Sequence, residues 1–255
     1  MKRALQVLGV IVLLVAAVVG AIGYSAFGGR TPLVDGAELP GGARVVKDGF
    51  VASFVLPAGE KEVALIDAGN DTSGTALLAE LSRRGLGPDA VKAIFLTHGH
   101  GDHLGGCHLF PNAQVMAFPA DVGLAAGTES AKGALTSGLK NPPERTCKVT
   151  HPLTDGESVT VGALTVRAFA TPGHTGGSAS YLANEVLYLG DNANADSDGK
   201  LSAAVRLFSD DPDENVRSLV ALGQKLKAEG ASVKLLAPAH TGQLEGLAPL
   251  TALKP

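Results

Sequence analysis

The amino-acid sequence predicts an α/β fold in which β-sheets are covered by helices. Short apolar runs that end in turn-forming residues recur along the chain, as expected of buried strands. Segments with apolar residues at helical spacing are interspersed with them, and 45% of the 255 residues are apolar, enough for a sizeable core. Because strand and helix patterns are mixed along the chain, neither a helical bundle nor an all-β barrel is expected.

The first part of the folded region is expected to hold strands around one helix. Apolar runs at 50–56 and 63–66 end in turn residues and predict the first two strands. Leucines at helical spacing predict a helix over residues 72–84, which ends at Gly85. Two further apolar runs predict buried strands, at 93–96 and 115–118.

The second part begins with residues 119–150, which carry no clear pattern and are expected to form a loop with one short helix. Asp211 and Pro212 are typical of a helix start, and Gly230 is typical of its end. Apolar residues at roughly helical spacing fill the interval between them. The remaining apolar runs predict strands at 158–161, 164–169, 179–182, 186–189 and 235–237.

Residues 1–30 differ in composition from the rest of the chain. Lys2 and Arg3 precede an apolar run over residues 4–27, and residues 7–23 have no polar side chain. About 20 such residues are needed to cross a bilayer, whereas the apolar part of a signal peptide has about 7–15. We therefore expect residues 1–30 to form a signal-anchor, or transmembrane, helix.

A cleaved signal peptide is the alternative for this segment, because small residues occur at suitable spacing near Ala21 and Gly23. The basic pair at the start favours a cytoplasmic N-terminus, so the catalytic domain is expected to be membrane-anchored and extracytoplasmic, or secreted or periplasmic after cleavage. Residues 31–44, rich in Gly and Pro, are expected to form a linker, and residues 45–255 the domain itself.

Charge and cysteine content bear on the partners and the compartment. The formal net charge is −4 and Lys and Arg form no run beyond pairs, so nucleic acid is not expected as a partner. A small-molecule substrate is compatible with this balance, and the sequence carries no signal for an oligomeric state. Cys107 and Cys147 either form a disulfide, which an extracytoplasmic location permits, or are two buried unpaired residues.

One short segment concentrates the chemistry. Three histidines and one aspartate fall within residues 98–103, directly after a predicted strand. Imidazole nitrogens and carboxylate oxygens are the usual non-thiolate ligands of zinc. Gly99 and Gly101 allow the backbone to turn sharply, so that these side chains can converge. A core gains nothing from packing several polar rings without a partner, so a metal site explains the cluster better than packing does.

Three further segments place a His or Asp at the end of an apolar run, beside small residues. They contain His174, Asp191 and His240. Side chains at strand ends sit on rigid elements, as a preorganised metal site requires. His108 lies outside these patterns and is expected to be a helix-surface or packing residue, and His151, which precedes Pro152, is expected to be exposed in a loop.

Together these motifs resemble the metallo-β-lactamase-like (glyoxalase II-like) hydrolase superfamily. The H-x-H-x-D-H motif of that family matches residues 98–103, and its later His, Asp and His match His174, Asp191 and His240. The resemblance covers roughly residues 45–245, nearly all of the expected domain. It implies an αββα sandwich with the active site at one edge of the two sheets.

The resemblance also implies a role for each residue. One metal would be bound by His98, His100 and His174, and the other by Asp102, His103 and His240. Asp191 would bind both metals as a bridge. The cofactors implied are two zinc ions, with iron or manganese as alternatives. Asp67 resembles a family carboxylate that orients a ligand or loop, and a simple strand-ending turn residue is the alternative.

The activity implied is hydrolysis, in which a hydroxide bridging two metal ions attacks a carbonyl or phosphoryl centre. Asp102 or a metal-bound water would protonate the leaving group. Asp at position 191 is atypical of the β-lactamase branch, so a thioester, lactone or phosphodiester is expected as substrate. Only 15 residues follow His240, fewer than the C-terminal helical region of glyoxalase II would need.

Two other functions are compatible with the same residues. One is a mononuclear iron enzyme of the same fold that oxidises sulfur, because His and carboxylate ligands also suit iron. The other is a membrane-tethered metal-binding module without catalysis. Loss of a ligand position would favour that module, and all seven positions are occupied by suitable residues.

Overall fold

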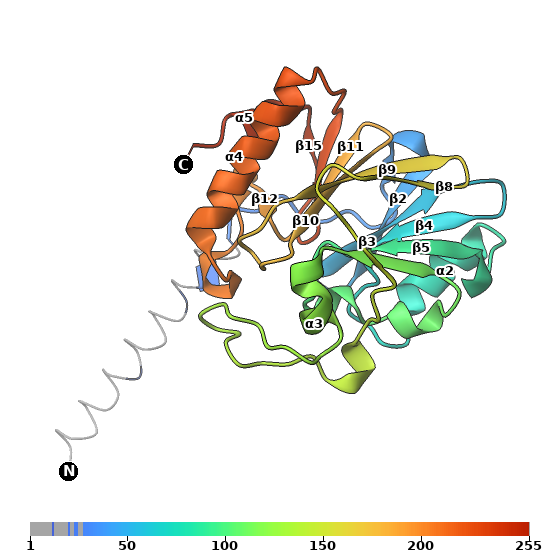
Figure 1. Cartoon of the computed structure of the whole chain (residues 1–255). Coiled ribbons are helices and arrows are strands. Elements are labelled where there is room, and N and C mark those ends of the chain that lie inside the picture. The colour runs from blue at the N-terminus through green and yellow to red at the C-terminus, as the bar shows by residue number, and fades with distance from the viewer. Residues whose placement is uncertain (1–11, 13–19, 21–22, 25–27, 255) are drawn as a thin grey trace, which may run out of the picture. The chain divides into compact units, whose positions relative to one another are not determined.

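The computed structural model describes residues 12, 20, 23–24 and 28–254. The chain divides into two units, Met1–Arg30 and Thr31–Pro255. The second unit contains two β-sheets that face each other, with helices on both outer faces (Figure 1). The predicted α/β fold, with sheets covered by helices, is confirmed.

The first sheet has seven strands, which follow one another across the sheet in chain order: β1 (Glu38–Leu39), β2 (Ala43–Asp48), β3 (Val51–Pro57), β4 (Val63–Ile66), β5 (Val91–Phe95), β6 (Gln114–Ala117) and β7 (His151–Pro152). The pairs from β1 to β4 are antiparallel. Those from β4 to β7 are parallel, so the carboxyl ends of β4, β5 and β6 lie at one edge.

The second sheet has six strands, in the order β15 (Leu244–Glu245), β14 (Leu235–Pro238), β11 (Val186–Gly190), β10 (Ala179–Ala183), β9 (Leu164–Ala170) and β8 (Ser158–Val161). Its one parallel pair is β11 with β14, which places the carboxyl ends of these two strands side by side. A separate hairpin consists of β12 (Ala193–Ala195) and β13 (Leu201–Ala203).

The longest described helix, α4 (Pro212–Ala228), begins at Asp211, whose side chain accepts hydrogen bonds from the N–H groups of Asp213 and Glu214. Its leucines pack against the outer face of the second sheet. The other helices are α2 (Thr75–Arg83), α3 (Val122–Ala125) and α5 (Ala248–Thr251), and the 3₁₀ turns are η1 (Pro40–Gly42), η2 (Pro88–Ala90), η3 (Gly101–His103), η4 (Cys107–Leu109), η5 (Pro119–Asp121), η6 (Pro143–Arg145) and η7 (Arg206–Phe208).

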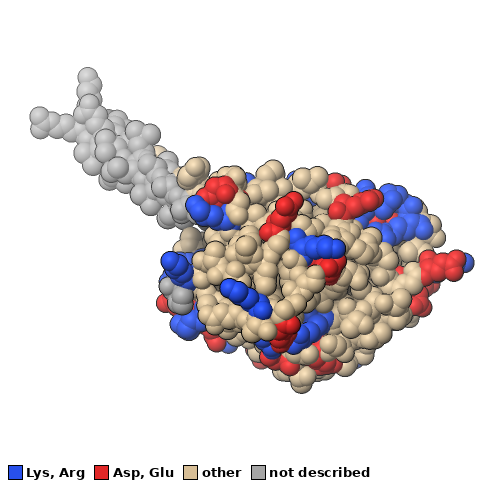
Figure 2. Space-filling model, turned by 90° about the horizontal axis from the view of Figure 1, so that it is seen from above, with Lys and Arg blue, Asp and Glu red and all other residues tan. Residues whose placement is uncertain are grey.

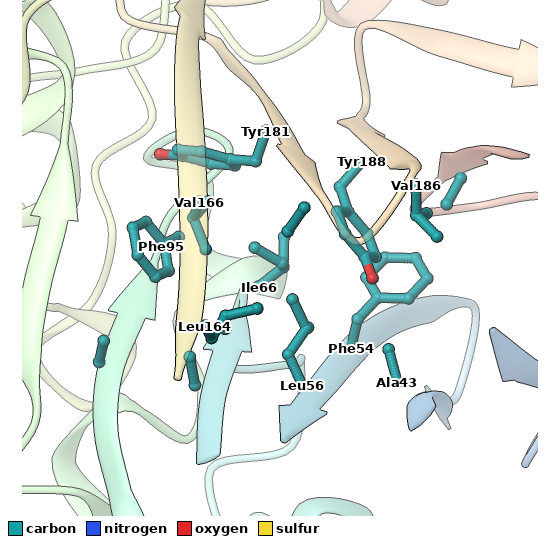
Figure 3. Packing of buried hydrophobic residues seen from close by; sticks show 14 of the residues in the cluster. Ala43, Phe54, Leu56, Ile66, Phe95, Leu164, Val166, Tyr181, Val186 and Tyr188 are labelled. Carbon is teal, nitrogen blue, oxygen red and sulfur yellow. The ribbon is translucent and has the colours of Figure 1, made fainter. Parts of the chain in front are cut away.

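Alternate side chains of the central strands serve different layers, because successive residues of a strand point to opposite faces. In β3, Phe54 lies between the sheets and Val55 packs in the layer under α2. In β11, Tyr188 lies between the sheets and Leu187 packs under α4. The Phe54 and Tyr188 rings meet edge to face with their centroids 4.9 Å apart, which joins the two sheets (Figure 3). Burial of each such side chain contributes about 1.5–3 kcal/mol.

The predicted linker over residues 31–44 is wrong. Residues 38–44 supply β1 and the start of β2, and Leu39 and Ala43 are buried between the sheets. The Thr31 N–H also donates to the carbonyl of Ala195, so the segment is hydrogen-bonded to the domain from its first residue. A Gly- and Pro-rich composition predicts turns, and here the turns connect edge strands.

The predicted membrane or signal helix over residues 1–30 falls mostly outside the described residues. Within the part of the chain that the structure describes, no helix is both long enough and apolar enough to span a bilayer. On the face of the molecule shown in Figure 2, acidic and basic side chains are interspersed, in keeping with the small net charge of −4.

Candidate metal centre

The loop after β5 carries the first four candidate ligands. Thr97 fixes its start, because the N–H and Oγ1 of Thr97 both donate to the carboxylate of Asp67, at 2.7 Å each. The chain then turns through η3, which contains Asp102 and His103. His174 comes from the loop between β9 and β10, Asp191 directly follows β11, and His240 comes two residues after β14. These elements meet at one edge of the two sheets, as the family resemblance implies.

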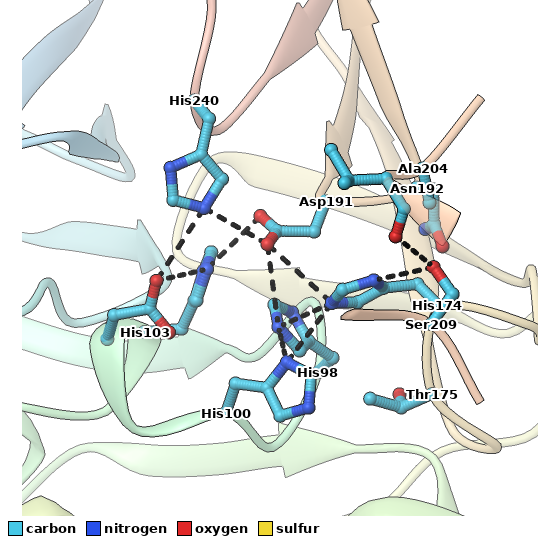
Figure 4. A network of polar contacts seen from close by, with 12 residues as sticks. His98, His100, His103, His174, Thr175, Asp191, Asn192, Ala204, Ser209 and His240 are labelled. Carbon is cyan, nitrogen blue, oxygen red and sulfur yellow. Dashed lines mark hydrogen bonds and ion pairs between the residues drawn. The ribbon is translucent and has the colours of Figure 1, made fainter. Parts of the chain in front are cut away.

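Three histidines form the first group (Figure 4). Nε2 of His98 lies 3.0 Å from Nδ1 of His100 and 3.2 Å from Nε2 of His174, and the last two nitrogens are 3.1 Å apart. Each of these contacts would need a proton on one of its two nitrogens to be a hydrogen bond. One cation among the three lone pairs would satisfy all of them at once.

The second group consists of Asp102, His103 and His240, with Asp191 between the two groups. Oδ2 of Asp102 lies 3.7 Å from Nε2 of His103 and 3.6 Å from Nε2 of His240. Asp191 places Oδ1 at 3.2 Å from His103 Nε2 and Oδ2 at 3.0 Å from His240 Nε2. Its Oδ2 is also 3.6 Å from Nε2 of His174 in the first group. All seven predicted ligand residues thus lie in one cluster, and Asp191 touches both groups (Figure 4).

Two buried atoms at the centre of the cluster, Nε2 of His103 and Oδ1 of Asp191, face each other at 3.2 Å but make no hydrogen bond of normal geometry. Buried polar atoms almost always have a hydrogen-bond partner, so a nitrogen and an oxygen that face each other without such a bond leave room for a shared cation. Nitrogen and carboxylate oxygen donors in groups of three are a normal ligand set for zinc. The residues present therefore fit divalent cations.

The first group supplies neutral nitrogen donors. Burial lowers the pKa of His174 to about 3. Burial, together with the neighbouring rings of His103 and His174, holds the pKa of His98 well below its ordinary value. A histidine must be neutral to bind a metal ion, so these rings need to lose no proton at neutral pH.

The second group shows the opposite balance. Burial disfavours the imidazolium of His103, but the charges of Asp191 and Asp102 outweigh burial and raise its pKa well above the ordinary value. For Asp191, burial disfavours the carboxylate, but His240 and His103 hold its pKa well below the usual range. The carboxylates of Asp102 and Asp191 thus draw positive charge to this group, as a cation site does.

Asp67 supports the second group. The residue is fully buried and adopts a left-handed backbone conformation with φ of 59° at the end of β4. Its Oδ2 lies 2.8 Å from Nδ1 of His103. A hydrogen bond from this Nδ1–H leaves Nε2 as the nitrogen that faces the cluster. The ligand-orienting role implied for Asp67 is therefore better supported than that of a turn residue alone.

Residues 46–240 match the family model of the metallo-beta-lactamase superfamily. This chain belongs to the metallo-beta-lactamase superfamily. The match spans all seven residues of the cluster and both sheets except for the edge strands β1 and β15 and the start of β2.

Two proteins of similar sequence carry different names. The uncharacterized protein YobT of Bacillus subtilis is 34% identical over 157 residues, which cover 56% of this chain and 62% of YobT. A hydroxyacylglutathione hydrolase of Yersinia pestis is 27% identical over 177 residues, which cover 67% of this chain and 56% of that protein. The chain thus spans less than two thirds of the length of either relative.

Solved structures show the same fold. The metallo-beta-lactamase SMB-1, bound to 2-mercaptoethanesulfonate, is 26% identical with a TM-score of 0.61, covering 83% of this chain and 82% of that one. A metallo-beta-lactamase family protein of Thermus thermophilus is 23% identical with a TM-score of 0.60, covering 84% and 77% of the two chains.

The sequence carries no signal for the buried residue Asp121 in η5, which contacts the loop of His98 and His100 and the loop of His174.

Residues outside the cluster also test the sequence-based expectations. Cys107 and Cys147 form a disulfide, so of the two alternatives for these cysteines the disulfide is confirmed. His108 is exposed. The exposed loop position expected for His151 is wrong: the residue begins β7, is half-buried and pairs with Glu157 at 2.7 Å. Both histidines lie outside the cluster, as expected.

Proposed function

We propose that this chain is a dinuclear metal-dependent hydrolase. The observation that carries the proposal is the arrangement of two three-residue groups around one shared carboxylate, Asp191. A carboxylate in that position can hold two cations close together, as in two-metal hydrolases. Two zinc ions are the proposed cofactors, since the donors are imidazoles and carboxylates only.

Residues of the chain have distinct roles in this proposal. His98, His100 and His174 would hold one cation, and Asp102, His103 and His240 the other. When bound, the cations would polarise a substrate oxygen and lower the pKa of a water molecule toward neutrality. Asp102 is the partly exposed carboxylate of the cluster, with 25% of its side chain accessible, so it can exchange a proton with a leaving group.

The substrate classes proposed are thioesters, lactones and phosphodiesters. The similarity to a hydroxyacylglutathione hydrolase supports a thioester, although the aligned region covers only 56% of that relative. The similarity to SMB-1, named a metallo-beta-lactamase, makes a β-lactam a necessary comparison in any assay. The proposed substrate is in every case a small molecule.

The test is metal analysis of the purified full chain, together with hydrolysis assays on one substrate of each class. About two zinc ions per chain and hydrolysis of one class would support the proposal. About one iron per chain without hydrolysis would replace it with sulfur oxidation at a mononuclear site. Tight metal binding without turnover of any substrate would instead favour a non-catalytic binding module.

Asp191→Ala tests the shared carboxylate in the same assays. We expect it to lose at least one metal per chain and to lower kcat/KM by more than about 100-fold, beyond what loss of a merely orienting residue causes. His108→Ala is the matched control, because it removes an exposed histidine outside the cluster. Unchanged metal content and activity in Asp191→Ala would contradict the bridging role.

We further propose that the folded domain works outside the cytoplasmic membrane, tethered by residues 1–30 or released after their cleavage. The apolar run with its basic start supports this location, and so does the disulfide, which is typical of oxidising compartments. Cell fractionation of the full-length chain and of a chain without residues 1–30 tests this location. If both are found in the cytosol, residues 1–30 are not an anchor.

A further inference from the structure

A second buried carboxylate lies beside the metal centre but outside both ligand groups. Asp121 ends η5 just before α3, and only 1% of its surface is exposed. Its Oδ2 accepts hydrogen bonds from the N–H of Gly99 and from Oγ1 of Thr175, both at 2.7 Å. Its Oδ1 accepts the N–H of Gly177, also at 2.7 Å. One side chain therefore holds two loops that are far apart in sequence.

These contacts fall next to the ligands of the first group. Gly99 stands between His98 and His100, and Thr175 directly follows His174. Fixing the backbone at these points fixes the positions from which all three imidazoles extend. We propose that Asp121 is the positioning residue of the three-histidine group, and that it sets the metal affinity of that group. The inference rests on the proposed metal centre.

The packing around Asp121 supports a dedicated role. A Cβ at Gly177 would lie 2.5 Å from the backbone nitrogen of Asp121 and 2.7 Å from its Oδ1. A Cβ at Gly99 would lie 2.9 Å from the backbone nitrogen of Ala125 in α3. Only glycine allows both loops to approach this closely, so the loop sequences and the carboxylate form one unit.

Asp121 and Asp67 divide the support of the centre between them. Asp67 bonds Nδ1 of His103 in the second group and reaches the first group only through Thr97, whose Oγ1 is 3.1 Å from Nδ1 of His98. Asp121 bonds backbone and hydroxyl groups of the first group's loops and contacts no ligand of the second group. Each group should therefore respond to the loss of its own carboxylate.

The test compares Asp121→Asn with Asp67→Asn in the full chain. Asparagine keeps the size of the side chain but turns an N–H₂ toward N–H donors that the carboxylate accepted. Zinc is titrated against a chromophoric chelator to obtain two dissociation constants, and His174→Ala and His240→Ala assign each constant to a group. Asp121→Asn should weaken the constant of the three-histidine group by about 10–100-fold and leave the other near its wild-type value. Asp67→Asn should chiefly weaken the other constant.

Cobalt substitution gives a second reading, because the visible spectrum reports the geometry at each site. Asp121→Asn should change the band assigned to the three-histidine group alone. Thr175→Val removes one hydrogen bond from Asp121 at constant size, so it should shift the same constant by less. Thermal unfolding of the metal-free variants separates lost stability from lost positioning.

Three outcomes would overturn the inference. Asp121→Asn could leave both constants unchanged, weaken both equally, or fail to fold while Thr175→Val binds zinc as the wild type does. A wild-type chain that binds no metal would overturn the proposed function as well. If the wild type binds two zinc ions but neither Asp121→Asn nor Thr175→Val selectively weakens the three-histidine group, the inference fails and the proposed function stands.

Discussion

Histidines of the candidate metal centre differ in the protonation state that the fold favours. His98 and His174 are buried among other imidazoles, so the neutral form is favoured. His103 and His240 face Asp191, so the charged form is favoured despite their burial. Metal binding would replace the protons of the second pair, and it would find the first pair already deprotonated.

This difference predicts how the metal-free chain responds to acid. The pKa of His174 is about 3 in the folded chain against an ordinary value of 6.5. Between these values the unfolded chain binds a proton that the folded chain does not, so the free energy of unfolding falls as the pH is lowered through this window. Each such proton contributes about 1.4 kcal/mol per pH unit. His103 and His240, with raised pKa values, lose their contribution only as the pH rises.

Urea titrations of chelator-treated protein at several pH values within this window measure the effect. His174→Asn should show a shallower dependence on pH than the wild type, because it removes one of the groups that titrate. His108→Asn, which changes an exposed histidine, serves as the control. An equal slope in His174→Asn and the wild type would show that His174 is not held neutral in the fold.

The sequence was more informative about the ligands than about the residues that support them. The four candidate ligands in residues 98–103 form a local motif, and His174, Asp191 and His240 each follow a recognisable apolar run. Asp121 has no such pattern, because its partners lie 22 to 56 residues away along the chain. A lone Asp after Pro119-Ala120 looks like an ordinary turn residue until the fold brings the two loops to it.

At the level of elements, strands with their own apolar run were predictable, and strands defined by their neighbours were not. All the strands expected from apolar runs occur, as β3 to β6, β8 to β11 and β14, within one or two residues. β1, β7 and β15 have two residues each, too few for a periodic pattern. β2 has no clear pattern of its own because its two valines are flanked by Arg44 and Lys47.

The start of α4 was predictable because its signal is local, and it carries a prediction of its own. Asp211→Ala removes the acceptor for the N–H groups of Asp213 and Glu214 and should lower the free energy of unfolding by about 1 kcal/mol. Asp211→Asn is the matched control, because asparagine caps helices about as well as aspartate. Chemical denaturation measures both variants. Equal losses in the two would mean that the charge, and not the cap, stabilises this helix.

At the scale of the whole molecule, the disulfide joins the metal loop to the long loop over residues 126–150. Cys107 lies in η4, four residues after His103. Cys147 lies near the end of the long loop, and its N–H donates to the carbonyl of Ala125 in α3. Both cysteines are buried. The pairing could not be read from the sequence, because it depends on the proximity of two loops that are 40 residues apart.

Closing a loop of 40 residues restricts the unfolded chain, so the double variant Cys107→Ala with Cys147→Ala should lose roughly 4 kcal/mol of unfolding free energy. Urea denaturation measures this loss. Reductant should bring the wild type to the same midpoint and leave the double variant unchanged, because the variant has no bond to break. Two free thiols that titrate in the denatured, unreduced wild type would contradict the pairing.

A different outcome is a wild type that shows no free thiols and whose unfolding midpoint does not respond to reductant. The disulfide would then add little stability. The long loop would be held mainly by its hydrogen bonds, such as those of Asn141 to Gly99 and Leu124.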